Sequence, residues 1–212
     1  MKPGRIIPII CTALMLGALP ACNISRTAAT PITHYTLEYE SPKMEKAEVL
    51  PYVIMIKRFS VSPDYNMLPI IYRDKAFVRN TYSYHRWRAN PGDLVTYYLA
   101  RDFKAQSAFT AVLSYDSNLR MTHTLEGVVE EFYERDGEDS WEAVLGFSVT
   151  LVKMHEPDVT RQIVFQKQYR LTQKADEKNP ESIAKAMSQA MEKASLMVME
   201  DVYAALEAAD RK

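Results

Sequence analysis

Residues 141–151 read WEAVLGFSVTL, and this stretch decides the fold because apolar side chains occupy every second position in it. Successive side chains of a β-strand point to opposite faces, so this period of two predicts a strand with one buried face and one polar face. The same alternation recurs at residues 125–129 and 163–171. Three such segments in succession predict a meander of antiparallel strands.

Local irregularities in the pattern indicate a bulge and a turn within this meander. Phe132 falls out of phase with Leu125 and Val129, which indicates a β-bulge. Gly137 and its charged neighbours indicate a turn before the strand at 141–151. In the third segment Ile163 and Tyr169 are expected on the buried face.

The residues before the meander predict further, shorter strands. Residues 35–39 alternate and predict a first strand, and residues 41–48 read as a charged loop. Residues 53–59 predict a second strand, with apolar side chains on both faces, as expected for a strand inside a sheet. Residues 61–89 contain two prolines and short aromatic pieces, among them 70–73, 76–78 and 82–85, which predict short strands or a hairpin.

Two helices complete the predicted domain, at about residues 91–108 and 180–209. Each begins with the same signal, an Asn-Pro pair at Asn90 and Asn179, in which Asn caps the helix and Pro occupies its first turn. Because these helices flank strands without alternating regularly with them, we expect a single α+β domain whose mainly antiparallel sheet is packed by two helices.

An apolar stripe runs along the second predicted helix and includes methionines. Ile183, Met187, Ala190, Ala194 and Met197 follow the three-or-four spacing of one helix face. The stripe predicts packing against the sheet. A methionine-rich face can instead form an adaptable binding surface, because the unbranched thioether side chain adjusts to irregular partners.

The first residues have the three parts of a secretory signal peptide. Lys2 and Arg5 precede an apolar run at 6–19, which is too short to span a membrane and ends in Leu-Pro-Ala-Cys. Leu19, Ala21 and Cys22 match the cleavage site of bacterial lipoproteins, so residues 1–21 are predicted to be removed. An ordinary signal peptide and an uncleaved anchor are the alternatives.

The mature protein is then expected to begin at a lipidated cysteine. Cys22 would carry acyl chains such as palmitate, and residues 22–34, rich in Ser, Thr, Ala and Pro, would form a tether. More than one chain makes attachment stable. Asn23 is not the Asp that commonly retains lipoproteins at the inner membrane, which favours the outer membrane, facing the periplasm.

Composition excludes several functional classes. Without Lys2 and Arg5 the chain has 24 basic and 27 acidic residues, a formal charge of −3, which gives no basic face for a nucleic acid. The mature domain would have no disulfide, because Cys11 is lost with the signal peptide and Cys22 is lipidated.

Patterns of catalytic or cofactor-binding residues are absent as well. The four histidines are widely spaced, and there is no phosphate-binding glycine loop and no nucleophile elbow. Glu130, Glu131 and Glu134 are candidate paired acids that read more simply as a solvated charge run. We therefore predict that the protein is not an enzyme and has no metal site and no cofactor.

One segment, residues 82–88, mixes aromatic and basic side chains. Two interpretations stay open for it. In the first, Trp87 and one tyrosine belong to the core. In the second, some rings are exposed and contact a partner or lipid, because exposed apolar patches mark interaction sites.

The order of residues in this region resembles the ABC-type transport auxiliary lipoproteins, a family that includes the lipoprotein of the paraquat-inducible system. The resemblance begins with Phe59 and Ile71-Tyr72-Arg73, continues through 82–87 and Pro91, and extends to 109–112 and 125–129. It implies that residues 35–212 form an ABC transport auxiliary domain. The motif residues, and so the candidate partner contacts, are Tyr72, Arg73, Tyr82, Tyr84, Arg86 and Trp87.

The resemblance also implies a role and partners. Such lipoproteins work with an ABC transporter permease and ATPase and with a periplasmic MCE-domain protein, a set that moves lipids or other hydrophobic molecules across the envelope. We therefore expect a lipid-anchored docking subunit of such a system, with assembly as a homo-oligomer left open. The alternative is a lipoprotein that binds and regulates an envelope enzyme such as a peptidoglycan synthase, since a fold does not fix a function.

Overall fold

Three long strands form the longest ladders of the sheet in the computed structural model, which describes residues 30–46, 48–138 and 140–211. They are β7 (His123–Asp136), β8 (Trp141–Lys153) and β9 (Ile163–Lys174), and they pair antiparallel in sequence order. The predicted meander is therefore confirmed. The register of β7 and β8 shifts between Val129 and Glu131, which is the predicted bulge, and the Gly137 amide donates to the Ser140 carbonyl across the predicted turn.

Parallel pairing, which we had not predicted, joins the N-terminal strands to β7. Strand β2 (Leu50–Ile56) lies between β7 and β6 (Phe109–Ser114) and is parallel to both. Strands β4 (Pro69–Arg73) and β3 (Ser60–Val61) also run parallel to β7. The sheet of nine strands that these described residues form is therefore mixed, with its longest ladders antiparallel.

A hairpin and a short first strand complete one edge of the sheet. Strand β5 (Asn80–Trp87) pairs antiparallel with β4, which confirms the predicted hairpin. Strand β1 (Thr33–Tyr35) pairs parallel with β5. The prediction of a strand at 35–39 is wrong in its bounds, because residues 36–39 are not in a strand, while Thr33 and His34, placed in the tether by the sequence, belong to β1. The predicted strand piece at 76–78 is the turn of the hairpin.

Both predicted helices are present and begin as expected. Helix α1 (Pro91–Gln106) and helix α3 (Pro180–Asp210) are capped by the side chains of Asn90 and Asn179, which accept hydrogen bonds from Gly92 and Ser182 amides. Helix α1 ends before residue 108 because Ser107 takes a left-handed conformation, with φ 50°. A one-turn helix α2 (Val159–Gln162) and a 3-10 turn (Pro63–Tyr65) were not predicted.

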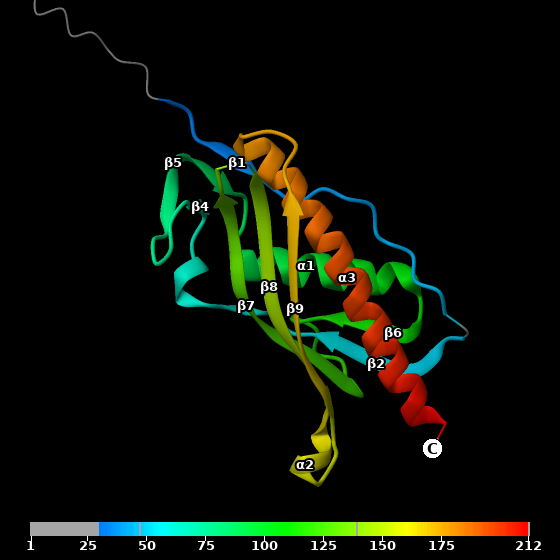
Figure 1. The fold of residues 1–212 in the computed structure, drawn as a ribbon. Helices are drawn as coiled ribbons and strands as arrows, with labels where there is room; N and C mark the ends of the chain where they lie inside the picture. Colours follow the sequence, from blue (N-terminus) through cyan, green and yellow to red (C-terminus); the bar gives the residue numbers. More distant parts are fainter. Residues whose placement is uncertain (1–29, 47, 139, 212) are drawn as a thin grey trace, which may run out of the picture. The chain divides into compact units, whose positions relative to one another are not determined.

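The helices form one layer against the sheet (Figure 1). Helix α3 packs on β8 and β9, helix α1 packs on β2, β6 and β7, and the two helices contact each other. Met187 and Met191 are fully buried, so packing explains most of the methionine stripe, although Met197 is exposed. Ile163, expected on the buried face, is 56% exposed because it lies at the start of β9, beside the exposed α2.

The predicted α+β class in one domain is confirmed for the residues from Pro31 onwards, which form one unit. The predicted signal peptide, Cys22 and the first part of the tether lie outside the described residues. Within the described part of the chain, no helix combines the length and the apolar character needed to span a membrane.

Candidate functional site

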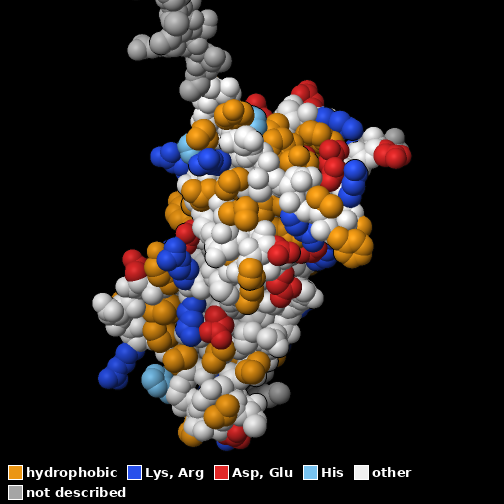
Figure 2. Space-filling model, turned by 90° about the vertical axis from the view of Figure 1, so that its left-hand side faces the viewer, with side chains coloured by type: hydrophobic (Ala, Val, Ile, Leu, Met, Phe, Trp, Pro, Cys, Tyr) orange, Lys and Arg blue, Asp and Glu red, His pale blue; other side chains and the backbone are white. Residues whose placement is uncertain are grey.

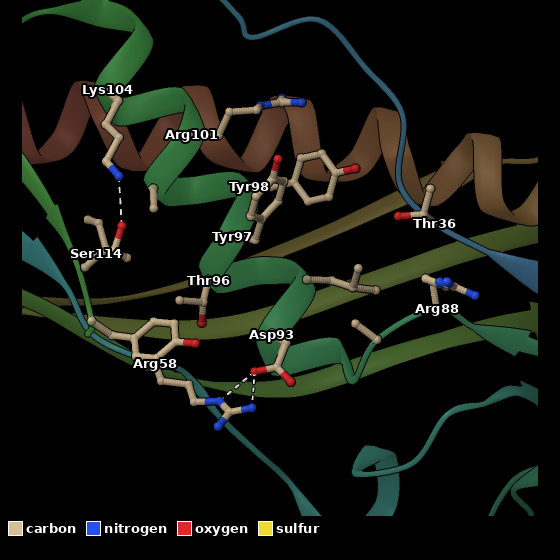
Figure 3. A pocket seen from close by; sticks show the side chains of 15 residues that line it. Thr36, Arg58, Arg88, Asp93, Thr96, Tyr97, Tyr98, Arg101, Lys104 and Ser114 are labelled. Atoms are coloured by element: carbon tan, nitrogen blue, oxygen red, sulfur yellow. Dashed lines mark hydrogen bonds and ion pairs between the residues drawn. The ribbon is translucent and has the colours of Figure 1, made fainter. Parts of the chain in front are cut away.

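A groove of about 620 Å³ runs beside helix α1 (Figure 3). Its size falls in the range of about 300–1,000 Å³ that is typical of ligand sites. Helix α1 provides more than half of the lining, and the ends of β2 and β6 and the segments after β1 and β5 provide the rest. Figure 3 shows Thr36 and Arg88 on one flank of α1 and Ser114 on the other.

Two tyrosine rings stand exposed in this groove. Tyr97 is 64% exposed and meets the ring of Tyr98 edge-on, with centroids 5.2 Å apart. Tyr115 is 52% exposed and lies beside the Arg58 guanidinium, 5.9 Å from the ring centroid. Because tyrosine offers a large rigid surface at low entropic cost, such rings are frequent at sites of molecular contact.

Cations outnumber acids around the groove. Its lining contains four cationic side chains, Arg58, Arg88, Arg101 and Lys104, and one acid, Asp93. Asp93 is neutralised by Arg58, whose Nε lies 2.6 Å from Oδ1. The Lys104 Nζ donates to the Ser114 hydroxyl at 2.8 Å.

Arg88 carries the least constrained charge of the groove. Its backbone amide donates to the Tyr35 carbonyl, which fixes the chain, but its guanidinium meets no ion-pair or hydrogen-bond acceptor within residues 30–46, 48–138 and 140–211. The exposed side chains of Arg88 and Lys104 therefore leave the groove with a positive potential that suits an anionic partner group.

A buried hydrogen-bond network holds Arg101 in place against the rings of Tyr39 and Tyr98. The fully buried Asp102 carboxylate accepts from the Tyr39 hydroxyl and from Arg101 Nε, each at 2.8 Å. The Arg101 guanidinium lies 4.3 Å from the Tyr39 ring centroid and 4.6 Å from that of Tyr98. Burial, followed by the nearby Asp102 charge, raises the pKa of the Tyr39 hydroxyl well above its usual range. Arg101 is therefore a fixed part of the groove wall.

The motif residues predicted from sequence lie elsewhere, on the β4–β5 hairpin. Trp87 is 2% exposed and packs edge-on against Phe132, with ring centroids 5.1 Å apart. This contact favours the core interpretation for Trp87. Tyr84 is exposed, and Arg86 and Arg73 are partly buried. Of the predicted contact residues, Tyr84 therefore offers the most free surface.

Tyr72 and Tyr82 belong to a half-buried cluster around Glu134. Their ring centroids lie 4.9 Å apart, and the Tyr82 hydroxyl donates to Glu134 Oε1 at 3.0 Å. Glu134 is 1% exposed, and its Oε2 has no hydrogen-bond partner in the described part of the chain. Burial, reinforced by the Asp136 charge, raises the pKa of Glu134 to about 7 although the Tyr82 hydrogen bond opposes this.

Glu134 corrects the interpretation of the acidic run. Glu131 is partly exposed and pairs with Arg170 at 2.6 Å, and Glu130 accepts a hydrogen bond from the Gln168 side-chain amide, so both carboxylates lie at the surface with polar partners. Glu134, in contrast, points into the core beneath the hairpin. Among the described residues, no group of three His, Cys, Asp or Glu side chains is arranged to hold a metal ion.

Comparisons with known proteins agree with this fold. Residues 35–198 match the model of a family described as ABC-type transport auxiliary lipoprotein component. A crystal structure of a DUF330-family protein from Xanthomonas campestris superposes with a TM-score of 0.76 at 13% identity, covering 85% of this chain and 99% of that one. A second crystal structure, of an uncharacterized protein, has a TM-score of 0.64 at 11% identity and covers 82% and 99%. No curated protein matches the chain.

Proposed function

The chain belongs to the family of ABC-type transport auxiliary lipoprotein components, and on this premise we propose that it is the lipid-anchored docking subunit of an MCE-type transport system. The family match over residues 35–198 carries the proposal. In this role the chain is held in the cell envelope by lipid on Cys22, at the outer membrane and facing the periplasm. Its partners are a permease, an ATPase and a periplasmic MCE-domain protein, and the cargo is a lipid or another hydrophobic molecule.

The chain itself performs no chemical step in this proposal. An auxiliary component can act by binding, while ATP hydrolysis takes place on another subunit. A rigid sheet packed by two long helices supports such a role, because it presents its surface residues in a fixed geometry.

The groove beside α1 is the docking surface that the geometry favours. Protein interfaces are enriched in tyrosine and arginine at the positions that contribute most binding energy. Tyr97, Tyr115 and Arg88 provide these residue types on one exposed surface. The unneutralised charges of Arg88 and Lys104 would pair with acidic side chains of the partner and steer its approach.

An affinity purification with groove variants tests this proposal. The tagged, lipidated protein is purified from membranes in mild detergent, and its partners are identified by mass spectrometry. We expect an MCE-domain protein with the unaltered chain, and its loss with Tyr97→Ala combined with Arg88→Glu. Val159→Ala, a change at a similarly exposed apolar side chain on α2, is the matched control and should retain the partner.

The outcomes separate the alternatives. Recovery of a peptidoglycan synthase in place of an MCE-domain protein would support regulation of an envelope enzyme. Recovery of the MCE-domain protein with the groove variant as well as with the control would keep the transport role and exclude the groove as its docking surface.

A further inference from the structure

The turn of the β4–β5 hairpin exposes a phenylalanine completely. Phe77 is 99% exposed, and Val78 beside it is partly exposed. The Val78 amide donates to the Lys75 carbonyl, so residues 75–78 form a turn in which Phe77 is the third residue. Scattered apolar side chains at a surface are ordinary, but full exposure of a ring at a turn leaves it without any packing partner.

The backbone at this position is unfavourable for phenylalanine. Phe77 has φ 66°, in the left-handed region that glycine adopts most readily and that bulky side chains adopt rarely. Residues kept in such conformations are concentrated at functional sites. The ring at this position therefore carries a conformational cost that no contact within the described residues offsets.

The base of the turn is held firmly to the core. The Asn80 amide donates to the Asp74 carboxylate at 3.2 Å, which ties the two ends of the loop together. Arg79 donates to the Tyr65 hydroxyl at 3.2 Å, and its guanidinium also lies 5.8 Å from the Tyr133 ring centroid. The ring of Phe77 is thus presented by a braced loop.

Charged side chains of both signs lie around the turn. A hollow of about 320 Å³ adjoins it and is lined by four cations and two acids. Two of the cations are engaged, because Arg135 pairs with Glu142 and Arg170 pairs with Glu131. Arg73 and Lys75 have no ion-pair partner in the described part of the chain, and neither do Asp74 and Asp136. Arg79 at the base of the turn bonds a neutral hydroxyl, so the turn has a small excess of positive charge. Figure 2 looks onto the side of the molecule where β4 and β5 lie, and shows hydrophobic side chains at the surface with basic and acidic side chains beside them.

An exposed aromatic ring beside cations without ion-pair partners is the chemistry of contact with an anionic bilayer. Aromatic rings settle at the boundary of headgroups and acyl chains, and each nearby lysine or arginine is attracted by anionic lipid. Thr33 follows Cys22 by eleven positions, so a lipid on Cys22 would hold β1 within roughly 40 Å of the membrane surface even with the tether fully extended. Strand β1 pairs with β5, the second strand of the hairpin.

We propose that the β4–β5 turn is a second membrane contact, in which Phe77 enters the bilayer interface and Arg73 and Lys75 meet anionic phospholipid headgroups. This contact rests on the lipid anchor proposed above. It would orient the domain on the membrane, because a single flexible tether restrains distance and leaves orientation free.

Tryptophan fluorescence in vesicles tests the contact. The full lipidated protein carrying Phe77→Trp is added to vesicles of phosphatidylethanolamine and phosphatidylglycerol, some of them with brominated acyl chains. We expect a blue shift and quenching by the brominated lipid, beyond the small signal of the native Trp87 and Trp141. Val159→Trp, at an exposed site on the distant α2, is the control and should show neither effect.

Charge and anchor are tested in the same assay. Adding Lys75→Glu to Phe77→Trp should reduce the quenching in vesicles that contain phosphatidylglycerol, and an unchanged signal would remove the headgroup part of the proposal. An unshifted, unquenched Phe77→Trp signal on vesicles that float with the protein would overturn the contact, and would point to a protein surface as the site of Phe77. Failure of the unaltered protein to float would refute the lipid anchor and with it the premise of the contact.

Discussion

Glu134→Gln should stabilise the protein at neutral pH and have little effect at acidic pH. The carboxyl group of Glu134 is buried under the hairpin, with one oxygen hydrogen-bonded to Tyr82 and the other unpaired within the described residues. Its pKa is raised from 4.5 to about 7, mainly because burial disfavours the charged form. Glutamine keeps an acceptor for the Tyr82 hydroxyl and has no charge to bury.

The sign and size of the effect follow from proton binding. Between about pH 4.5 and pH 7 the unfolded carboxyl is ionised while the folded one keeps its proton, so the free energy of unfolding falls as pH rises. One pKa unit corresponds to about 1.4 kcal/mol, so the full penalty above pH 7 is about 3 kcal/mol. The glutamine variant should therefore gain about 3 kcal/mol at pH 8 and almost nothing at pH 4.5.

Urea unfolding of both proteins from pH 4.5 to pH 8 measures this difference. His123, whose pKa burial lowers to about 4, weakens folding in acid, but it is present in both proteins and its effect cancels. Glu131→Gln, at a partly exposed carboxylate of the same strand that is paired with Arg170, is the matched control and should show no comparable gain. The reasoning would be refuted if the difference in unfolding free energy between Glu134→Gln and the unaltered protein stayed constant across this pH range.

Three further changes probe packing and anchoring. Trp87→Ala should cost about 3–5 kcal/mol of unfolding free energy, because it removes a buried ring that packs on Phe132; a loss under 1 kcal/mol in denaturant titration would contradict core packing. Gly127→Ala should reduce the free energy of unfolding by about 1–3 kcal/mol and so lower the thermal midpoint, because its new Cβ would lie 2.2 Å from the Ser148 carbonyl oxygen. An unchanged midpoint would show that β7 and β8 can separate at this position. Cys22→Ser should abolish labelling by palmitate and leave the circular dichroism of the folded domain unchanged, and persistent labelling would refute lipidation at this residue.

Local patterns predicted the elements whose partners are close in sequence. The Asn-Pro pairs at Asn90 and Asn179 located both helix starts, because a cap depends only on the next few residues. The alternation at 141–151 located β8 for a similar reason, since the period of two reflects which face is buried. The phase slip at Phe132 located the bulge. The same slip puts Glu134 on the face of Phe132, and this was the available signal that Glu134 is buried.

The candidate sites could not be assembled in the same way. The groove combines Arg88 after β5, Tyr97 on α1 and Tyr115 after β6, and the packing of α1 on β6 brings Tyr115 to the other two. Residues 76–78 read as a strand piece, because apolar composition alone does not distinguish a strand from a turn whose ring is exposed.

Sequence alone predicted the class of the domain, its helix caps and its long antiparallel strands, because each depends on local periodicity or on a short motif. A short motif also makes Cys22 the candidate for lipidation, which stays a prediction. Three-dimensional packing was needed to establish the parallel pairing of β2 with β6 and β7, the burial of Trp87 and Glu134, and the exposure of Phe77. Those properties depend on which distant segments meet. Side-chain periodicity indicates the two faces of a strand, but it does not show which distant segment covers each face.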